Sequence, residues 1–321
     1  MDPTQSTSPE THAEGAVRKA VLLMLLSVVL FAGNALLIRA LGTLGQVDAW
    51  VVSTSRFLVG FAVLFGLFYR RGNFQPRHLF SNPLLIIRGI LGAIGVWIYY
   101  LTLVELGPGR ATFISNTYVV FGAIMAGLFL REPLSGRLIV SLILAMTGLA
   151  LLTGVTDLKA PGSYEILGIA GAVIAGFIVV CIRKLHQRES SSTIFGAQCF
   201  YGLAVSTIPS VHRDTEFTAL ILTLLVACGL MAAFGQLAMT RAYKDLPVAQ
   251  GSMLQLLLPP VIAVGGVVFF NETYNGIELL GAGLTLTACL VTARTKPRLA
   301  SGLPAKEVKP DHRPPPDRPV S

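Results

Sequence analysis

The chain alternates between long apolar segments and short polar ones. Windows of about 20 mostly apolar residues, the length that a helix needs to cross a membrane, recur along it, and none shows the period-two alternation of a membrane barrel strand. We therefore expect an all-α polytopic membrane protein with ten transmembrane helices near residues 20–41, 49–70, 84–105, 110–130, 134–154, 165–184, 193–211, 218–240, 247–270 and 276–294.

The same pattern of residues occurs twice. Residues 106–132 read LGPGRATFISNTYVVFGAIMAGLFLRE, and residues 246–272 read LPVAQGSMLQLLLPPVIAVGGVVFFNE, at a spacing of 140 positions (246 − 106). Each half of the chain holds five predicted helices, so the second half enters the membrane in the opposite direction. Inverted repeats of this kind are typical of secondary transporters, whose substrate site lies near the midplane where the repeats meet.

The repeats divide the chain into segments. Residues 18–154 form the first repeat and residues 165–294 the second, and a polar linker at 155–164 joins them into one expected transport unit. Residues 1–17 are polar, and residues 295–321 contain seven prolines. Neither end can bury enough apolar surface to fold, so both are predicted to be disordered tails. Binding of a partner by the proline-rich tail is left open.

Composition and charge add a topology. The chain is 53% hydrophobic and only 13% charged, with a mean hydropathy of +0.67, whereas soluble domains are about 25% charged. Fifteen basic residues flank the spans on the side of the N-terminus and four on the other, so the positive-inside rule places both termini in the cytoplasm. Asn73 is then cytoplasmic, and Lys159 and Asn275 lie on the opposite side. The net charge of +8 reflects this topology, not nucleic-acid binding.

A longer run of residues carries a family resemblance. Residues 88–136, RGILGAIGVWIYYLTLVELGPGRATFISNTYVVFGAIMAGLFLREPLSG, combine an Arg-Gly start to the third helix, many small residues, a tight turn and a fourth helix closed by a Glu. The run resembles the EamA type of the drug/metabolite transporter superfamily, over roughly residues 17–294. The resemblance implies ten helices as two inverted five-helix repeats and movement of small metabolites, often outward, across a bacterial plasma (inner) membrane.

The chain departs from the family pattern in two places. The Gly of the closing Gly-Glu pair is replaced by Arg131 in the first repeat and by Asn271 in the second. Many relatives carry a Pro in the middle of the fourth helix, where this chain has Tyr118, while the ninth helix keeps Pro259 and Pro260. The sequence therefore leaves open whether the fourth helix is broken.

Polar residues within the spans indicate a candidate cavity, because such side chains are costly unless they face other helices or water. Thr112, Ser115 and Asn116 share one face of the fourth helix, and Ser252 and Gln255 hold the equivalent positions of the ninth (112 + 140 and 115 + 140). These matched faces predict a substrate-binding cavity between the halves. For the serine and threonine residues taken singly, a hydrogen bond to their own helix backbone is the favoured role, whereas for Asn116 and Gln255 cavity lining and packing are equally favoured. The weaker candidates are Asn34, Trp97, Tyr100 and Gln236.

Arg56 lies about 10 Å into the second helix at 1.5 Å per residue, where a cation is expensive. It would either pair with an anionic substrate or bond to carbonyls at a neighbouring helix end, and we favour the second role. Glu132 and Glu272 are expected to cap or pair at helix ends. The tenth helix, with Thr285, is assigned to the periphery.

Other functional classes find less support in the sequence. The seventeen acidic residues lie in tails, loops or helix ends, so no buried proton relay is predicted, and uniport or exchange of a small polar metabolite is the simpler mechanism. The metabolite class remains broad and includes amino acids, nucleotide-like and drug-like compounds. The four cysteines are isolated, and no catalytic, metal or nucleotide motif is present, so we expect no enzyme, no metal and no cofactor. The expected partners are a small-molecule substrate and the lipid bilayer, with a homodimer left open. A channel, a membrane scaffold or sensor, and a membrane-embedded transferase are the alternatives.

Overall fold

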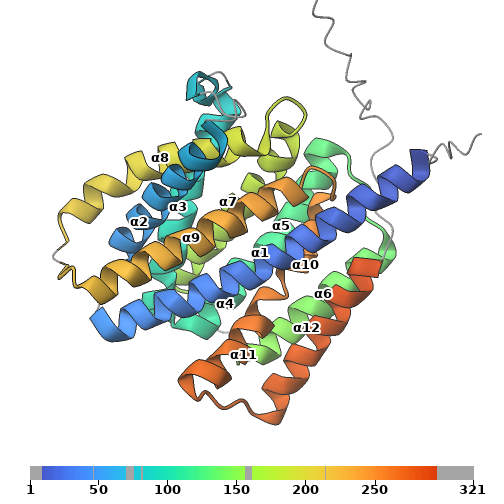
Figure 1. The fold of residues 1–321 in the computed structure, drawn as a ribbon. Helices are drawn as coiled ribbons and strands as arrows, with labels where there is room; N and C mark the ends of the chain where they lie inside the picture. Colours follow the sequence, from blue (N-terminus) through green and yellow to red (C-terminus); the bar gives the residue numbers. More distant parts are fainter. Residues whose placement is uncertain are drawn as a thin grey trace, which may run out of the picture.

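The computed structural model describes residues 9–45, 47–69, 76–80, 82–155, 161–213 and 215–294, and it confirms an all-α polytopic fold (Figure 1). Asn73, Lys159, half of the linker (156–160) and the proline-rich tail lie outside these residues. The helices are α1 (Pro9–Gly45), α2 (Ala49–Leu64), η1 (Phe65–Tyr69), η2 (Pro76–Phe80), α3 (Pro83–Leu106), α4 (Pro108–Asn116), α5 (Tyr118–Met125), η3 (Ala126–Leu130), α6 (Gly136–Leu152), α7 (Ser163–Leu185), α8 (Ser191–Val211), α9 (Ala219–Ala242), α10 (Val248–Gln255), α11 (Leu258–Phe270) and α12 (Gly276–Arg294).

Short polar residues start many of these helices, because their side chains accept hydrogen bonds from the free N–H groups of the first turn. Asp48 accepts from Trp50 N at 2.8 Å at the start of α2. Ser135, Ser190 and Thr218 do the same for α6, α8 and α9. Helix α1 begins at Pro9, well before the predicted start near residue 20, because a hydropathy window detects only its apolar part. It therefore includes residues 9–17, which the sequence assigned to a tail.

The fourth and ninth predicted spans are both interrupted, at equivalent positions. In the fourth span, α4 ends at Asn116 and α5 begins at Tyr118, with Thr117 between them. The Thr117 hydroxyl donates to the carbonyl of Ile114 at 2.6 Å. In the ninth span, α10 and α11 are separated by two residues just before Pro259 and Pro260, which lack the N–H groups that would continue the helix. The fourth helix is thus broken without a proline.

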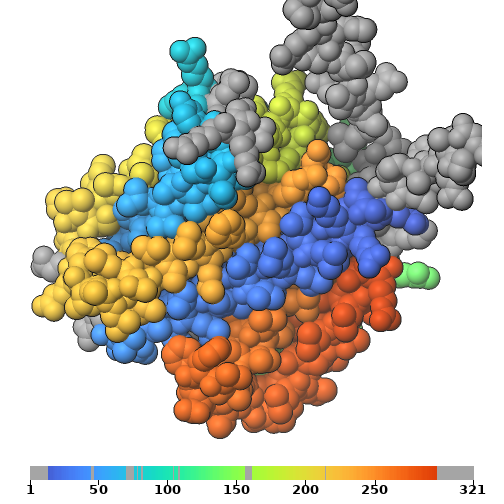
Figure 2. Space-filling view, viewed as in Figure 1, coloured from blue at the N-terminus to red at the C-terminus, as the bar shows by residue number. Residues whose placement is uncertain are grey.

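The two halves interleave instead of packing as separate domains. Helix α1 of the first half packs against α9 and α11 of the second, while α7 of the second half packs against α3 and α5 of the first. Two further pairs, α2 with α8 and α6 with α12, join helices that are equivalent in the two repeats. On the face drawn in Figure 2, α1 runs between α9 on one side and the α11–α12 segment on the other.

The outer surface of the bundle is apolar. Nine of the described helical segments are long and apolar enough to cross a membrane, and α6, with 17 residues, is a shorter apolar helix. Large hydrophobic side chains are exposed around the bundle, among them those of Leu22, Val140, Val211 and Val264. A soluble protein rarely exposes so much contiguous apolar surface, whereas lipid solvates it well.

Helices α6 and α12 approach each other closely through two glycines. A Cβ atom added at Gly281 would lie 2.5 Å from the carbonyl oxygen of Gly148 and 2.5 Å from the amide nitrogen of Leu152. Small residues at such crossings let the helix backbones approach. Thr285, which the sequence assigned to the periphery, is fully buried in this contact and donates to Gly281 O at 3.0 Å.

Gly281→Ala is expected to lower the free energy of unfolding by about 1–3 kcal/mol, the usual cost of forcing a methyl group into a filled contact. Gly283→Ala is the matched control, since nothing lies within 4 Å of a Cβ added there and alanine is the better helix former. Thermal unfolding of both variants in detergent measures the difference. Equal stability of the two variants would contradict the close contact.

Candidate substrate-binding site

The bundle has two ends, which we name by the elements that meet there. At the terminal face α12 ends and α10 begins, and at the distal face α1 ends and α4 begins. The fourth and ninth spans run in opposite directions. The fourth span therefore ends beside the start of the ninth at the terminal face, and the ninth ends beside the start of the fourth at the distal face. One of the two ion pairs described below lies at each of these meeting points.

A cavity of about 240 Å³ lies between the two halves, on the distal side of the helix breaks. Residues of α1, α2, α3, α4, α5 and α11 line it, together with Gln255 at the end of α10. The lining mixes aromatic and aliphatic side chains with a few polar groups, as ligand pockets usually do. We call it the central cavity, and its lining residues are Phe31, Asn34, Ala35, Ile38, Arg56, Val96, Tyr99, Tyr100, Thr112, Ser115, Asn116, Tyr118, Gln255, Leu258, Pro259 and Ile262.

Seven of the predicted site residues meet in the central cavity. They are Asn34, Arg56, Tyr100, Thr112, Ser115, Asn116 and Gln255. Some of their polar atoms are already engaged: the Asn116 amide donates to the carbonyl of Thr112 at 2.8 Å, within its own helix. The Gln255 amide donates to Ser27 Oγ of α1 at 3.0 Å, and thereby ties α10 to α1.

Three predicted site residues lie elsewhere. Ser252 is fully buried on the terminal side of the cavity, where its hydroxyl bonds to that of Tyr243 at 3.0 Å. Trp97 stacks on Trp50 with ring centroids 5.8 Å apart. Gln236 lies behind the cavity wall, where its Oε1 accepts from Arg56 at 3.4 Å. The repeat spacing predicted that Ser252 would line the cavity beside Gln255. In the structure it packs against Tyr243 and does not line the cavity.

The contacts of Arg56 differ from those expected. Among the described residues its guanidinium hydrogen-bonds to Gln236, not to carbonyls at a helix end, and it lies 5.8 Å from the ring centroid of Phe31. Arg56 also lines a second, much smaller void of about 10 Å³, together with Gln198, Cys199 and Gln236. We call this void the inner compartment. Arg56 therefore connects it to the central cavity.

The terminal side of the central cavity is closed by α10 and a buried ion pair. All eight residues of α10 are buried. Glu132, directly after the fourth span, accepts from Arg183 Nε of α7 at 3.1 Å and from the amide of Val248 at 2.8 Å. Only 8% of the Arg183 side chain and 5% of the Glu132 side chain is exposed. The Arg183 guanidinium also donates to the carbonyls of Tyr243 and Lys244. We call these contacts the terminal closure.

The distal face carries the repeat-equivalent pair in an open arrangement. Glu272 is equivalent to Glu132 (132 + 140), and the Ile38-Arg39 pair near the end of α1 recurs as Ile182-Arg183 near the end of α7. Glu272 pairs with Arg39, and 43% of the Arg39 side chain and 31% of the Glu272 side chain is exposed. Burial alone would raise the pKa of Glu272, but hydrogen bonds from Tyr274 and Arg39 outweigh it and lower the pKa. Glu272 therefore stays ionised near neutral pH, and the pair remains at the surface.

The two glutamates are oriented by the same backbone device. Arg131 and Asn271 have φ values of 54° and 53°, in the left-handed region that favours glycine. In each case the following Glu amide donates back to the helix, to Ala126 O or to the equivalent Gly266 O. These are the positions at which the family resemblance leads us to expect Gly. Arg131 and Asn271 therefore preserve the left-handed backbone conformation that ends each helix, and they differ from Gly only in carrying a side chain.

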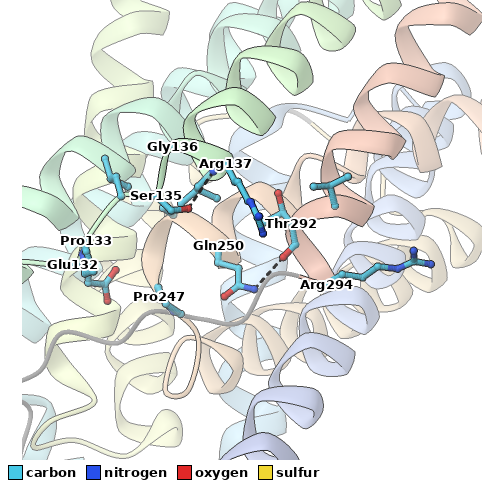
Figure 3. Close-up of a pocket in the computed structure, with 13 residues that line it drawn as sticks. Glu132, Pro133, Ser135, Gly136, Arg137, Pro247, Gln250, Thr292 and Arg294 are labelled. Atoms are coloured by element: carbon cyan, nitrogen blue, oxygen red, sulfur yellow. Dashed lines mark hydrogen bonds between the residues drawn. The ribbon is translucent and has the colours of Figure 1, made fainter.

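A larger cavity of about 1000 Å³ lies at the terminal face, between the starts of α6 and α10 and the end of α12 (Figure 3). Figure 3 shows Glu132 and Pro247 at its lining, and the Gln250 amide donates to Thr292 O at 3.1 Å. Residues 249 and 250 of α10 line this cavity, while Gln255 at the other end of α10 lines the central cavity. Helix α10 therefore separates the two.

Sequence reasoning missed two arginines that the structure makes prominent. The sequence places Arg183 among the basic residues that flank the spans and in the repeat of Ile38-Arg39, but it does not predict its pairing with Glu132. Arg88 was read only as a helix start, yet it is fully buried. A lone cation inside the apolar window 84–105 was the available signal, because such residues are rare and usually functional.

The fold and cavity define a polytopic helical membrane protein with two interleaved, inverted repeats around a central cavity. The model of the EamA-like transporter family matches residues 18–154 and again residues 162–294. The chain belongs to this family and is a multi-pass membrane transporter.

Several known proteins are similar to the chain. The pseudopaline exporter CntI of Pseudomonas aeruginosa is 25% identical over 286 residues, which cover 87% of this chain and 98% of that protein. An uncharacterized transporter of Clostridium kluyveri is 22% identical, over 83% of this chain and 90% of its own. A protein of known crystal structure superposes with a TM-score of 0.73 at 18% identity, over 85% of this chain and 95% of that one, and this likeness shows the fold.

Proposed function

We propose that the chain is a secondary transporter that exports or exchanges a small polar metabolite by alternating access between its two repeats. The observation that carries this proposal is the inequality of the two equivalent Glu–Arg pairs. The Glu132–Arg183 pair is buried and closed, while Arg39 and Glu272 remain exposed. Exchange of the two arrangements would open the terminal side and close the distal side around a fixed site.

The inequality of the pairs has a basis in the sequence. Glu132 accepts from the amide of Val248, but the equivalent position of the first repeat, 108, is proline and has no N–H group. A distal closure would therefore lack one of the hydrogen bonds of the terminal closure. We infer that the arrangement closed at the terminal face is the more stable of the two, and that substrate binding supplies free energy for the exchange.

Export is the proposed direction, because the most extensively matching relative named above is called an exporter. A channel is the second candidate, but the eight buried residues of α10 and the buried ion pair block a continuous pore in this arrangement. Comparing the metabolites in the medium of cells with and without the protein would identify candidate cargo. In proteoliposomes, saturable flux with counterflow supports a transporter, whereas flux without saturation or counterflow would establish a channel.

Alternating access predicts that the terminal side opens transiently. In a cysteine-free background, Ala249→Cys on buried α10 is expected to react slowly with a small thiol reagent applied at the terminal face. The additional change Glu132→Gln removes the charge of the terminal closure and should speed labelling at 249 severalfold. A cysteine at Gln187, already exposed at the terminal face, serves as the control, because its labelling rate should not depend on the closure. Unchanged labelling at 249 would count against the closure.

The proposed orientation places the terminal face in the cytoplasm, since the basic excess lies there. Single cysteines at Gln187, exposed at the terminal face, and at Asn275, exposed at the distal face, test it. In intact cells an impermeant reagent should label position 275 and spare position 187. The reverse result would invert the topology.

A further inference from the structure

Arg88 is a buried cation without a counter-charge. It lies in the second turn of α3, it is 0% exposed, and none of its three guanidinium nitrogens finds a hydrogen-bond acceptor among the described residues. An isolated charge buried in this way is very costly unless something pairs with it. Its surroundings therefore call for a negative group.

The elements around Arg88 supply none. Helix α3 packs against α7 and α8, and α2 packs against α8 and α9. Residues 49–104, 191–213 and 217–244 contain no Asp or Glu. The acidic residue of α7, Glu165, stands in its first turn at the distal face and pairs with Arg110 at 3.0 Å. Among the described residues, the elements packed around Arg88 therefore hold no free carboxylate for it, and a bound anion is the partner to test.

A chain of polar side chains joins Arg88 to the central cavity. Arg88 Nη1 and Gln198 Nε2 lie 3.8 and 3.9 Å from the point where a Cβ of Gly92 would stand. Gln198 lines the inner compartment with Arg56 and Gln236, and its buried Oε1 has no donor among the described residues. Arg56 in turn lines the central cavity. The compartment is one water molecule in size, so it must widen to admit a larger group.

We propose that Arg56 and Arg88 bind the carboxylate of an anionic substrate, first at Arg56 in the central cavity and then at Arg88 as the halves rearrange. Guanidinium groups bind carboxylates through two parallel hydrogen bonds, and a planar carboxylate needs less room in a widened compartment than a tetrahedral phosphate. The inference rests on the proposed transport function and gives its cargo a class, a small metabolite with at least one carboxylate.

The test measures thermal unfolding of the purified protein with sodium acetate, sodium succinate or sodium phosphate, against sodium chloride at equal ionic strength. The carboxylates are expected to raise Tm by roughly 2 °C or more at concentrations well above Kd. Arg56→Gln and Arg88→Gln should each lose this rise, while Arg110→Gln, whose arginine pairs at the distal face, should keep it. Arg88→Gln alone, without added anion, should unfold at the wild-type temperature or above, because it removes an unpaired buried charge.

Several results would overturn the proposal. They are an equal rise with chloride, a larger rise with phosphate, a carboxylate response that survives in both variants, and an Arg88→Gln protein that fails to fold. The last would show that the unpaired charge is a structural requirement. Counterflow in proteoliposomes is measured separately. If carboxylates stabilise the protein but no flux is found, the carboxylate site is supported and the transport proposal is rejected. If flux is found but carboxylates do not stabilise the protein, the carboxylate site is rejected and the transport proposal is supported.

Discussion

Arg183→Gln is expected to lower the free energy of unfolding by about 3–5 kcal/mol, because removing one partner of a buried ion pair leaves the other charge uncompensated. Glu132 would keep only the hydrogen bond from the amide of Val248, and the carbonyls of Tyr243 and Lys244 would lose their donor. Thermal or denaturant unfolding of the purified protein in detergent measures the change.

Arg39→Gln is the matched control, since it removes the equivalent arginine from the distal pair. Exposed ion pairs contribute little after solvent screening, and both Arg39 and Glu272 are substantially exposed, so its stability should stay near that of the wild type. The comparison depends only on the difference between two equivalent pairs. Similar losses in both variants would show that the terminal closure is no stronger than its distal counterpart.

Asn116→Leu and Gln255→Leu are expected to weaken substrate transport strongly while leaving a folded, membrane-inserted protein. Both side chains line the central cavity from equivalent spans. Loss of a hydrogen bond to a desolvated polar substrate costs about 1–3 kcal/mol, or roughly five- to 150-fold in affinity. The measurement is the concentration dependence of flux in proteoliposomes, with unfolding temperature recorded for each variant.

The control for these variants is Thr287→Leu, because Thr287 is exposed on α12 and donates only within its own helix, to Gly283 O at 2.8 Å. Thr285, the control that the sequence alone would have chosen, is buried between α6 and α12. Gln255 also holds α1 through Ser27, so a loss seen only in Gln255→Leu would reflect packing. Normal transport in both variants would remove the central cavity as the binding site.

Local sequence patterns predicted much of the architecture. A span needs about 20 apolar residues because the bilayer has a fixed thickness, so the number and order of the helices follow from hydropathy. The spacing of 140 positions predicted which residues of the two repeats are equivalent, including Glu132 with Glu272. The helical period placed Thr112, Ser115 and Asn116 on one helix face.

Contacts between distant segments were decided only by the tertiary structure. Arg183 meets Glu132 across 51 positions and Gln255 meets Ser27 across 228, and no local period encodes such pairs. Ser252 and Gln255 are near neighbours on α10, yet one packs against Tyr243 and the other faces the cavity.

The sequence by itself therefore determined the membrane-spanning helices, the inverted repeat and the candidate polar faces, because bilayer thickness and helical period act on neighbouring residues. The tertiary structure decided which of two equivalent ion pairs is closed, where the cavity lies and that Arg88 is buried without a counter-charge. Under the proposed alternating access, the two equivalent repeats would exchange these arrangements. In this structure helices far apart in the chain bury the Glu132–Arg183 pair, while Arg39 and Glu272 remain exposed.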